Sequence, residues 1–134
     1  MTIVIEGDPV PAQRPRFSGK RAYQPKRNVE YRQAVQSAAM EAMSGREILR
    51  GAISAIVRLY RRYKPTARNF GDVDNFLKAI FDGMNQIVFA DDAQIVRCVV
   101  EKFTDKKNPR AEVSICAAEN EQVDERLLFG RQGQ

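Results

Sequence analysis

The sequence of 134 residues contains no histidine and only two cysteines. The absence of histidine excludes a Ser-His-Asp triad, a Cys-His dyad, a zinc site with imidazole ligands and an imidazole general base. The two cysteines do not form a C-x-x-C motif, so a thiolate metal site is excluded as well. Any catalytic chemistry must therefore depend on carboxylates, lysine, tyrosine or a bound metal ion.

Long hydrophobic runs are also missing. No segment approaches the roughly 18 uninterrupted apolar residues of a membrane-spanning helix, and the N-terminal run MTIVIEGDPV reaches acidic residues and proline too early for a signal peptide. We therefore expect a soluble, cytoplasmic protein with no membrane partner. Cys98 and Cys116 lie in apolar, strand-like runs, so we expect two buried, reduced thiols; a disulfide between neighbouring strands is the alternative.

The hydrophobic content of 43%, with seven Phe and four Tyr, is sufficient for one small domain with a packed core. We expect strands at residues 2–6, 52–60, 94–103 and 111–117, and helices at about 28–43 and 74–88. Asn28 is the predicted N-cap of the first helix. The order β-α-β-α-β-β predicts an α/β (α+β) domain over residues 1–118, in which two helices pack on a mixed sheet of about four strands. Residues 119–134 are expected to form a tail that is partly helical or frayed.

Basic and acidic residues are segregated along the chain, although the net charge is only +5 (22 Lys+Arg minus 17 Asp+Glu). Residues 13–32 contain seven basic residues and one acid, and residues 48–71 contain six basic residues and no acid. Residues 8–25 contain four of the six prolines, which predicts an extended arm or long hairpin. The expected loop at 61–71 is also basic. Aromatic residues are interleaved in both segments, a pattern typical of binding to a polyanion with stackable bases. A solvated basic face is the alternative interpretation.

An acidic segment, residues 72–92, follows both basic segments. The helix expected at 74–88 has an apolar face and an adjacent face with Asp74, Lys78 and Asp82, and Asp72 directly precedes it. Each carboxylate also has a purely structural interpretation. Asp72 or Asp74 would serve as a helix N-cap, Asp82 would pair with Lys78 one turn away, and the Asp91-Asp92 pair would form a turn.

Considered together, the carboxylates indicate a metal site. The strand after the helix can return alongside it, which would bring Asp91 or Asp92 to Asp72 and Asp74. A site of oxygen ligands alone suits Mg²⁺, for which Mn²⁺ can substitute, and does not suit zinc. The ion would polarise a phosphodiester and generate hydroxide, and Lys78 would stabilise the transition-state charge or position the water.

Two motifs resemble those of one nuclease family. The run G-D-V-D-N-F-L-K-A-I-F-D-G-M-N at residues 71–85, followed by F-A-D-D-A-Q-I-V at 89–96, resembles the D-x-D-N-x-x-K-x-x-x-D motif and downstream D-D of the RusA family of Holliday junction resolvases. The N-terminal P-V-P-A-Q-R-P-R-F, with Y-Q-P-K and E-Y-R after it, is similar to the phage and prophage branch of that family. The resemblance covers about residues 1–117.

The resemblance implies a Mg²⁺-dependent homodimer that resolves four-way junction DNA in recombination and repair, with each subunit nicking one of two opposing strands. Its catalytic residues fall on Asp72, Asp74 and Asp92, which also bind the metal, and on Lys78; Asp91 adjoins a ligand position. The DNA-binding residues fall on Arg14, Arg16, Lys20, Lys26, Arg61, Arg62, Lys64 and Arg68, with Phe17 as a candidate wedge at the crossover. The alternatives are a non-catalytic binder of branched DNA, which would have no need of Lys78, and a broader flap or fork nuclease.

Overall fold

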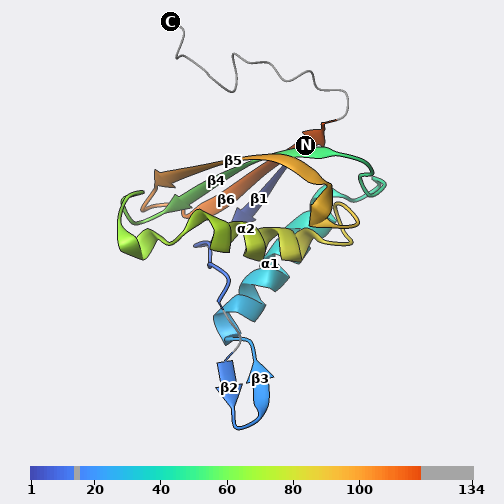
Figure 1. The fold of residues 1–134 in the computed structure, drawn as a ribbon. Coiled ribbons are helices and arrows are strands. Elements are labelled where there is room, and N and C mark those ends of the chain that lie inside the picture. Colours follow the sequence, from blue (N-terminus) through green and yellow to red (C-terminus); the bar gives the residue numbers. More distant parts are fainter. Residues whose placement is uncertain (14–15, 119–134) are drawn as a thin grey trace, which may run out of the picture.

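The computed structural model describes residues 1–13 and 16–118. Its regular elements (Figure 1) are β1 (Thr2–Glu6), β2 (Arg16–Ser18), β3 (Arg21–Tyr23), α1 (Lys26–Ala42), β4 (Ile53–Arg61), α2 (Val73–Met84), β5 (Ile95–Thr104) and β6 (Arg110–Ala117), with short 3-10 helices at Arg68–Phe70 and Asp92–Gln94. The small α/β domain with two helices and a mixed four-stranded sheet, predicted from the sequence, is confirmed. No helix in the described ranges is long and apolar enough to span a bilayer.

The main sheet has the strand order β1-β6-β4-β5. β6 pairs antiparallel with both β1 and β4, whereas β4 and β5 run parallel. A parallel pair requires a crossover connection, and α2 lies within the one that joins β4 to β5. The start of α2 therefore follows the end of β4, and the Asp91-Asp92 segment follows α2 directly before β5.

Both helices lie on one face of the sheet (Figure 1). The strand residues that point toward them are apolar and almost completely buried: Ile3, Ile5, Ile53, Ala55, Val57, Leu59, Ala111, Val113 and Ile115. Apart from the buried Ser54, they alternate with exposed or half-exposed residues, as expected for a strand covered on one side. The amphipathic face predicted for the second helix is present, since Phe76, Ile80 and Met84 are buried against this sheet face.

The opposite face of the sheet is not covered by any described element. It carries a stacked pair, Tyr60 and Phe103, with ring centroids 5.0 Å apart, and the guanidinium of Arg110 lies 3.8 Å from the Tyr60 ring centroid. The expected burial of the cysteines is wrong, because Cys98 and Cys116 are both exposed. A disulfide between adjacent strands is also wrong, because β4 lies between their strands, β5 and β6.

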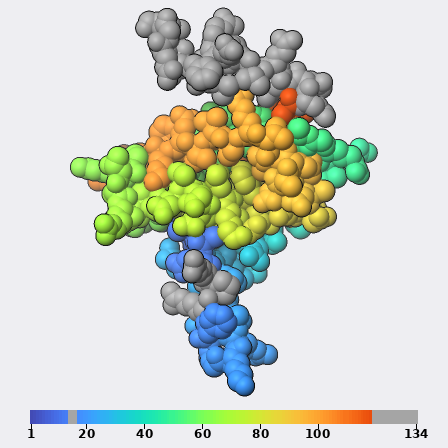
Figure 2. All heavy atoms as spheres, viewed as in Figure 1, coloured from blue at the N-terminus to red at the C-terminus, as the bar shows by residue number. Residues whose placement is uncertain are grey.

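A separate two-stranded hairpin, β2-β3, projects away from the sheet beyond the N-terminal end of α1 (Figures 1 and 2). It confirms the arm or long hairpin expected between residues 8 and 25. The segment before it is tied to the domain, because the Ala12 N–H donates to the Asn75 carbonyl at 3.0 Å and the Asn28 amide donates to the Pro11 carbonyl at 2.9 Å.

Two helix boundaries differ from those expected. α1 starts at Lys26 with Pro25 at the N-cap position, and Asn28 is not the cap because its side chain bonds the arm instead. α2 ends at Met84, not at residue 88, because Asn85 leaves the helical conformation with a ψ of 133°. Gln86 then adopts a positive φ of 69°, and its N–H donates to the Phe89 carbonyl at 2.7 Å. Residues after Met84 still reach the core, which explains why their apolar spacing resembled a continuing helix.

Candidate active site

Asp72 and Asp74 lie at the start of α2, after a tightly constrained connection from β4. The Phe70 ring before them is completely buried. Gly71 has a φ of 103°, and a Cβ at this position would lie 2.8 Å from the Phe76 ring, so both the backbone and the packing require glycine there. Packing on both sides of Asp72 therefore determines where the two carboxylates leave the core.

Neither carboxylate caps the N-terminus of α2. Asp72 occupies the N-cap position in an extended conformation, but its side chain makes no capping hydrogen bond. Asp74 lies in the first turn, and both residues are exposed. The capping interpretation is therefore wrong for Asp72. Both carboxylates are accessible to a cation from solvent.

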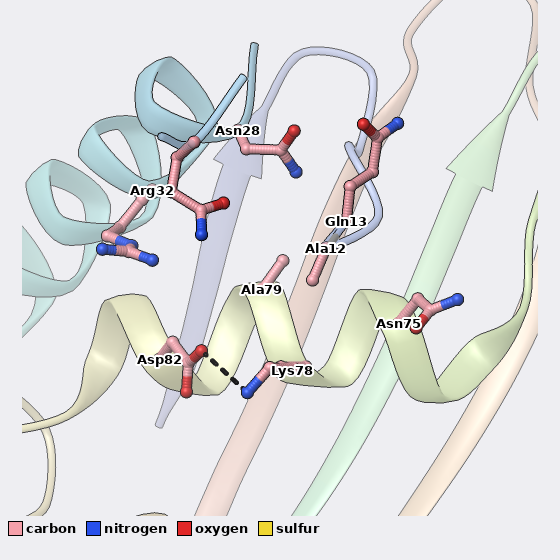
Figure 3. A pocket seen from close by; sticks show the side chains of 9 residues that line it. Ala12, Gln13, Asn28, Arg32, Asn75, Lys78, Ala79 and Asp82 are labelled. Carbon is pink, nitrogen blue, oxygen red and sulfur yellow. Dashed lines mark ion pairs between the residues drawn. The ribbon is translucent and has the colours of Figure 1, made fainter. Parts of the chain in front are cut away.

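Lys78 lies one turn after Asp74 and pairs with Asp82 on the following turn. Its Nζ is 3.5 Å from Asp82 Oδ2, which confirms the expected ion pair (Figure 3). The Lys78 side chain is 69% exposed and that of Asp82 is 33% exposed, so the pair contributes little to stability. Its effect is to hold the ammonium group on the exposed side of α2.

Asp91 has a structural role, as the turn interpretation of the Asp91-Asp92 pair predicted. It caps the short 3-10 helix that follows, and its Oδ1 accepts a hydrogen bond from the Ala93 N–H at 3.0 Å. The Gln94 side chain accepts the Asp91 N–H at 3.1 Å, which completes a capping box. The hydrogen bond from Ala93 is the main cause that lowers the pKa of Asp91, and a hydrogen bond with the Asp92 side chain acts in the same direction.

Asp92 is half-buried beside Asp82. Its N–H donates to the Asn85 side chain at 3.1 Å, and Asp92, Asp82 and Lys78 line a shallow hollow of about 300 Å³. The pKa of Asp92 is raised, first by its hydrogen bond with Asp91, then by desolvation and by the charges of Asp91 and Asp82. The structure thus brings Asp82 into the site, whereas its spacing from Lys78 indicated only an ion pair.

The carboxylates form two groups along α2. Asp74 and Asp82 are eight residues apart, or about 12 Å along the helix axis, so Asp72 and Asp74 lie at one end of α2 and Asp92 lies near the other. Among the described residues, no three acidic or cysteine side chains are placed to hold one metal ion together. The expected gathering of Asp72, Asp74 and Asp92 around a single ion is therefore not found within one chain.

The chemistry of these groups nevertheless fits a hard divalent cation. All the candidate ligands are carboxylates, which Mg²⁺ and Mn²⁺ prefer. Mg²⁺ is usually held by only one or two carboxylates, and waters and substrate phosphate oxygens complete its shell. The pair Asp72 and Asp74, or the pair Asp82 and Asp92, supplies a donor set of this size.

The predicted DNA-binding residues of the hairpin region are accessible where the structure describes them. Lys20 and Lys26 are exposed, and Lys26 makes an exposed contact of 3.7 Å with Glu30. Phe17 is 71% exposed at the hairpin, which is consistent with a stacking contact. Arg14 lies outside the described residues, and the side chain of Arg16 is not described.

In the second basic segment, Arg62, Lys64 and Arg68 are exposed, but Arg61 is 5% exposed. Its guanidinium makes a two-point ion pair with Asp8 and donates to the Phe70 carbonyl. The expectation that Arg61 binds DNA is corrected by this placement. Arg61 lies on the buried side of β4. The sequence shows only two adjacent arginines, Arg61 and Arg62, and does not show which of them points into the core.

Taken together, these features define a small α/β protein with an acidic site next to basic surfaces, an arrangement suited to phosphodiester chemistry. The chain belongs to the RusA endodeoxyribonuclease family, whose model, described as Endodeoxyribonuclease RusA, matches residues 6–116. The family confirms a nuclease and agrees with the motifs at residues 71–96. The chain is also 30% identical, over 132 residues, to the "Uncharacterized protein YqaN" of Bacillus subtilis (strain 168), a match that covers 83% of this chain and 92% of that protein.

Proposed function

We propose that this protein is a Mg²⁺-dependent endonuclease that acts as a homodimer and resolves four-way DNA junctions by paired nicks. One observation carries the proposal. The first motif carboxylate, Asp72, directly before α2, and the motif lysine, Lys78, on α2, are both exposed, and the Asp72 side chain makes no capping hydrogen bond that would account for it structurally. The family match supplies the nuclease chemistry to which these side chains are suited.

Asp72 and Asp74, at the start of α2, would bind the metal, and Asp92 with Asp82 would form a second acidic pair that can hold a metal ion. When bound, Mg²⁺ supplies charge stabilisation at the scissile phosphate and lowers the pKa of a bound water. Lys78 contributes a positive charge next to this phosphate, and Asp82 keeps the ammonium group in position at 3.5 Å. Removing Asp82 would therefore weaken the positioning of Lys78 without removing its charge.

DNA would follow the exposed basic residues on both sides of α2. Lys20 and Lys26 lie at the hairpin end, and Arg62, Lys64 and Arg68 lie in the loop before α2. These side chains neutralise phosphates without reading sequence. Phe17, at the projecting hairpin, would stack on an unpaired base at the crossover. A homodimer follows from the reaction, because symmetric nicks in two opposing strands need two sites.

The test uses synthetic four-way junctions with labelled strands. Wild-type protein is expected to cut two opposing strands with Mg²⁺ and to stop when EDTA is added. The variants Asp72→Asn and Asp74→Asn are expected to lose cutting by at least a hundredfold and to retain binding, which relief of repulsion from phosphate would strengthen. The control Glu41→Gln removes one exposed carboxylate from the far end of α1 and is expected to cut like wild type.

Three results would contradict the proposal in different ways. Normal cutting by Asp72→Asn or Asp74→Asn would show that the metal site is assigned wrongly. Equal cutting of flaps, forks and junctions would identify a broader branched-DNA nuclease. Binding of junctions without cutting, in Mg²⁺ and in Mn²⁺, would identify a DNA-binding protein that lacks the enzymatic step. Sedimentation at the assay concentration measures the oligomeric state.

A further inference from the structure

A second concave site adjoins the hollow that contains Asp92. This pocket has a volume of about 420 Å³, which is within the range of small-molecule and cofactor sites, roughly 300–1,000 Å³. Residues of α1, of α2 and of the segment after β1 surround it (Figure 3). Lys78 and Asp82 line both this pocket and the hollow that contains Asp92, so the two spaces are neighbours along α2.

The lining of the pocket is unusual in its chemistry. Four of its side chains are carboxamides: Gln13, Gln24, Asn28 and Asn75. Each carboxamide offers both hydrogen-bond donors and an acceptor, which is the combination that recognises the edge of a nucleobase. Two cations, Arg32 and Lys78, lie at the same pocket and can pair with phosphate. The small side chains of Ala12 and Ala79 leave room between these polar groups.

Most of the carboxamide side chains of the pocket can form hydrogen bonds with a ligand. Within the part of the chain that the structure describes, the side chains of Gln13, Gln24 and Asn75 have no hydrogen-bond partner. The Asn28 amide group donates to the Pro11 carbonyl at 2.9 Å, which leaves its side-chain oxygen as an acceptor. A base edge can therefore bind most of these carboxamides without breaking a hydrogen bond among the described residues.

The walls of the pocket are held in place before any ligand binds. The bond from Asn28 to Pro11 ties α1 to the segment after β1, and the Ala12 N–H donates to the Asn75 carbonyl at 3.0 Å, which ties that segment to α2. α1 and α2 pack closely near the pocket, since a Cβ at Gly83 would lie 2.7 Å from Val35. A preformed pocket of this kind costs little rearrangement on binding.

We infer that this carboxamide pocket accepts an unstacked nucleotide next to the cut and reads its base. The inference rests on the proposed function, which places the scissile phosphate at Lys78. A nucleotide adjacent to that phosphate reaches the pocket only if its base leaves the helical stack. Extruding a base costs least where pairing or stacking is already disturbed, as at the crossover of a four-way junction. The pocket therefore gives the enzyme a preference for the sequence at the crossover.

The experiment uses the full chain and junctions in which 2-aminopurine replaces one base at a time around the crossover. Binding is measured in EDTA, so that no cutting is needed. One position is expected to show a rise in fluorescence with wild-type protein, because 2-aminopurine brightens when it is unstacked. The double variant Gln13→Ala/Gln24→Ala is expected to lose at least half of this rise. The matched control Gln33→Ala removes an exposed carboxamide of α1 that does not line the pocket.

A second measurement follows cutting in Mg²⁺ on junctions that differ only in the bases at the crossover. Wild-type protein is expected to cut some sequences faster than others. In the double variant the ratio between the fastest and the slowest rate is expected to fall by about tenfold, which is the discrimination typical of a good base contact. A folding defect would instead lower cutting of every sequence by the same factor and leave the preference unchanged.

The outcomes separate the pocket from the nuclease. If wild type cuts junctions but the double variant keeps the same sequence preference, or no position brightens, the nucleotide pocket is overturned and the nuclease stands. If wild type cuts nothing, the proposed function fails. A fluorescence rise that depends on Gln13 and Gln24 would still support the pocket in that case, and its absence would overturn both.

Discussion

Arg61 and Asp8 form a two-point ion pair that links the end of β4 to the segment after β1. The distances are 2.8 Å from Nε to Oδ1 and 3.0 Å from Nη2 to Oδ2. The same guanidinium donates to the Phe70 carbonyl and lies 5.4 Å from the Phe76 ring centroid. Arg61 thus connects the N-terminal segment to the connection that positions Asp72, and it acts on the candidate site through packing.

The Asp8→Asn variant tests this role of the ion pair. Removing the charge of Asp8 leaves the buried Arg61 guanidinium without its counter-ion, and breaking such a pair usually costs about 3–5 kcal/mol. Asp8 is 28% exposed, so we expect a smaller loss of about 2 kcal/mol in the free energy of unfolding. Urea denaturation measures it, with Glu41→Gln as the control. A change below about 0.5 kcal/mol, the range of neutral surface substitutions, would contradict the assigned role.

Gly83 is expected to be required for the close contact between α1 and α2. A Cβ at Gly83 would lie 2.7 Å from Val35 Cγ1 and 3.4 Å from the Arg32 carbonyl oxygen. Gly83→Ala gains helix propensity of about 1 kcal/mol, but overpacking costs about 1–3 kcal/mol, so we expect a net loss of stability. Val35→Ala in the same chain should recover part of the Gly83→Ala loss. Independent effects of the two substitutions in a double-mutant cycle would contradict the contact.

The ion pair between Asp105 and Arg110 makes a pH-dependent contribution to stability. Hydrogen bonds from the Asn108 N–H and the Arg110 guanidinium, with Nη1–Oδ2 of 3.0 Å, lower the pKa of Asp105. The unfolded chain therefore binds more protons than the folded chain as the pH falls below about 3.9, the ordinary pKa of aspartate. The contribution is present above that pH and is lost as the pH falls through the lowered, folded-state pKa.

We accordingly expect Asp105→Asn to lower the urea midpoint at pH 7, and we expect the difference from wild type to shrink as the solution is acidified through this range. Chemical denaturation at a series of pH values measures both. Equal destabilisation of Asp105→Asn at neutral and strongly acidic pH would show that the carboxylate charge is not the cause.

The salt dependence of binding shows which exposed basic residues contact phosphate. A residue that contacts phosphate releases a counterion, so its removal should reduce the slope of log affinity against log salt by about 0.9 per contact. We expect this change for Arg62→Ala and for Arg68→Ala, measured by binding to a junction in EDTA. Arg46→Ala, at an exposed position after α1, is the matched control and should leave the slope unchanged. An unchanged slope in the first two variants would exclude their loop from the DNA-binding surface.

The order of the elements was predictable because it depends on local patterns. Alternating apolar residues in strands such as Ile53–Arg61, and the apolar face of Val73–Met84, are visible in short windows of sequence. The predictions were wrong where the structure replaced the local conformation or interaction that the sequence pattern indicated. Asn28 has the side chain of an N-cap, yet it bonds Pro11 in the arm. The apolar pattern continues past Met84, but Asn85 leaves the helical conformation and Gln86 adopts a positive φ, so α2 ends there.

The sequence by itself determined the chemistry available to this protein: carboxylates and one lysine in a RusA-type motif, two basic segments before it, and no histidine. These are properties of residue types and their spacing, which do not depend on packing. Only the tertiary structure decided which of these residues meet. It buried Arg61 against Asp8, separated Asp72 and Asp74 from Asp92 along α2, and brought Gln13 and Gln24 to Lys78. Such placements depend on which strand face the helices cover and on how distant segments return to one another, and neither is encoded in a local window.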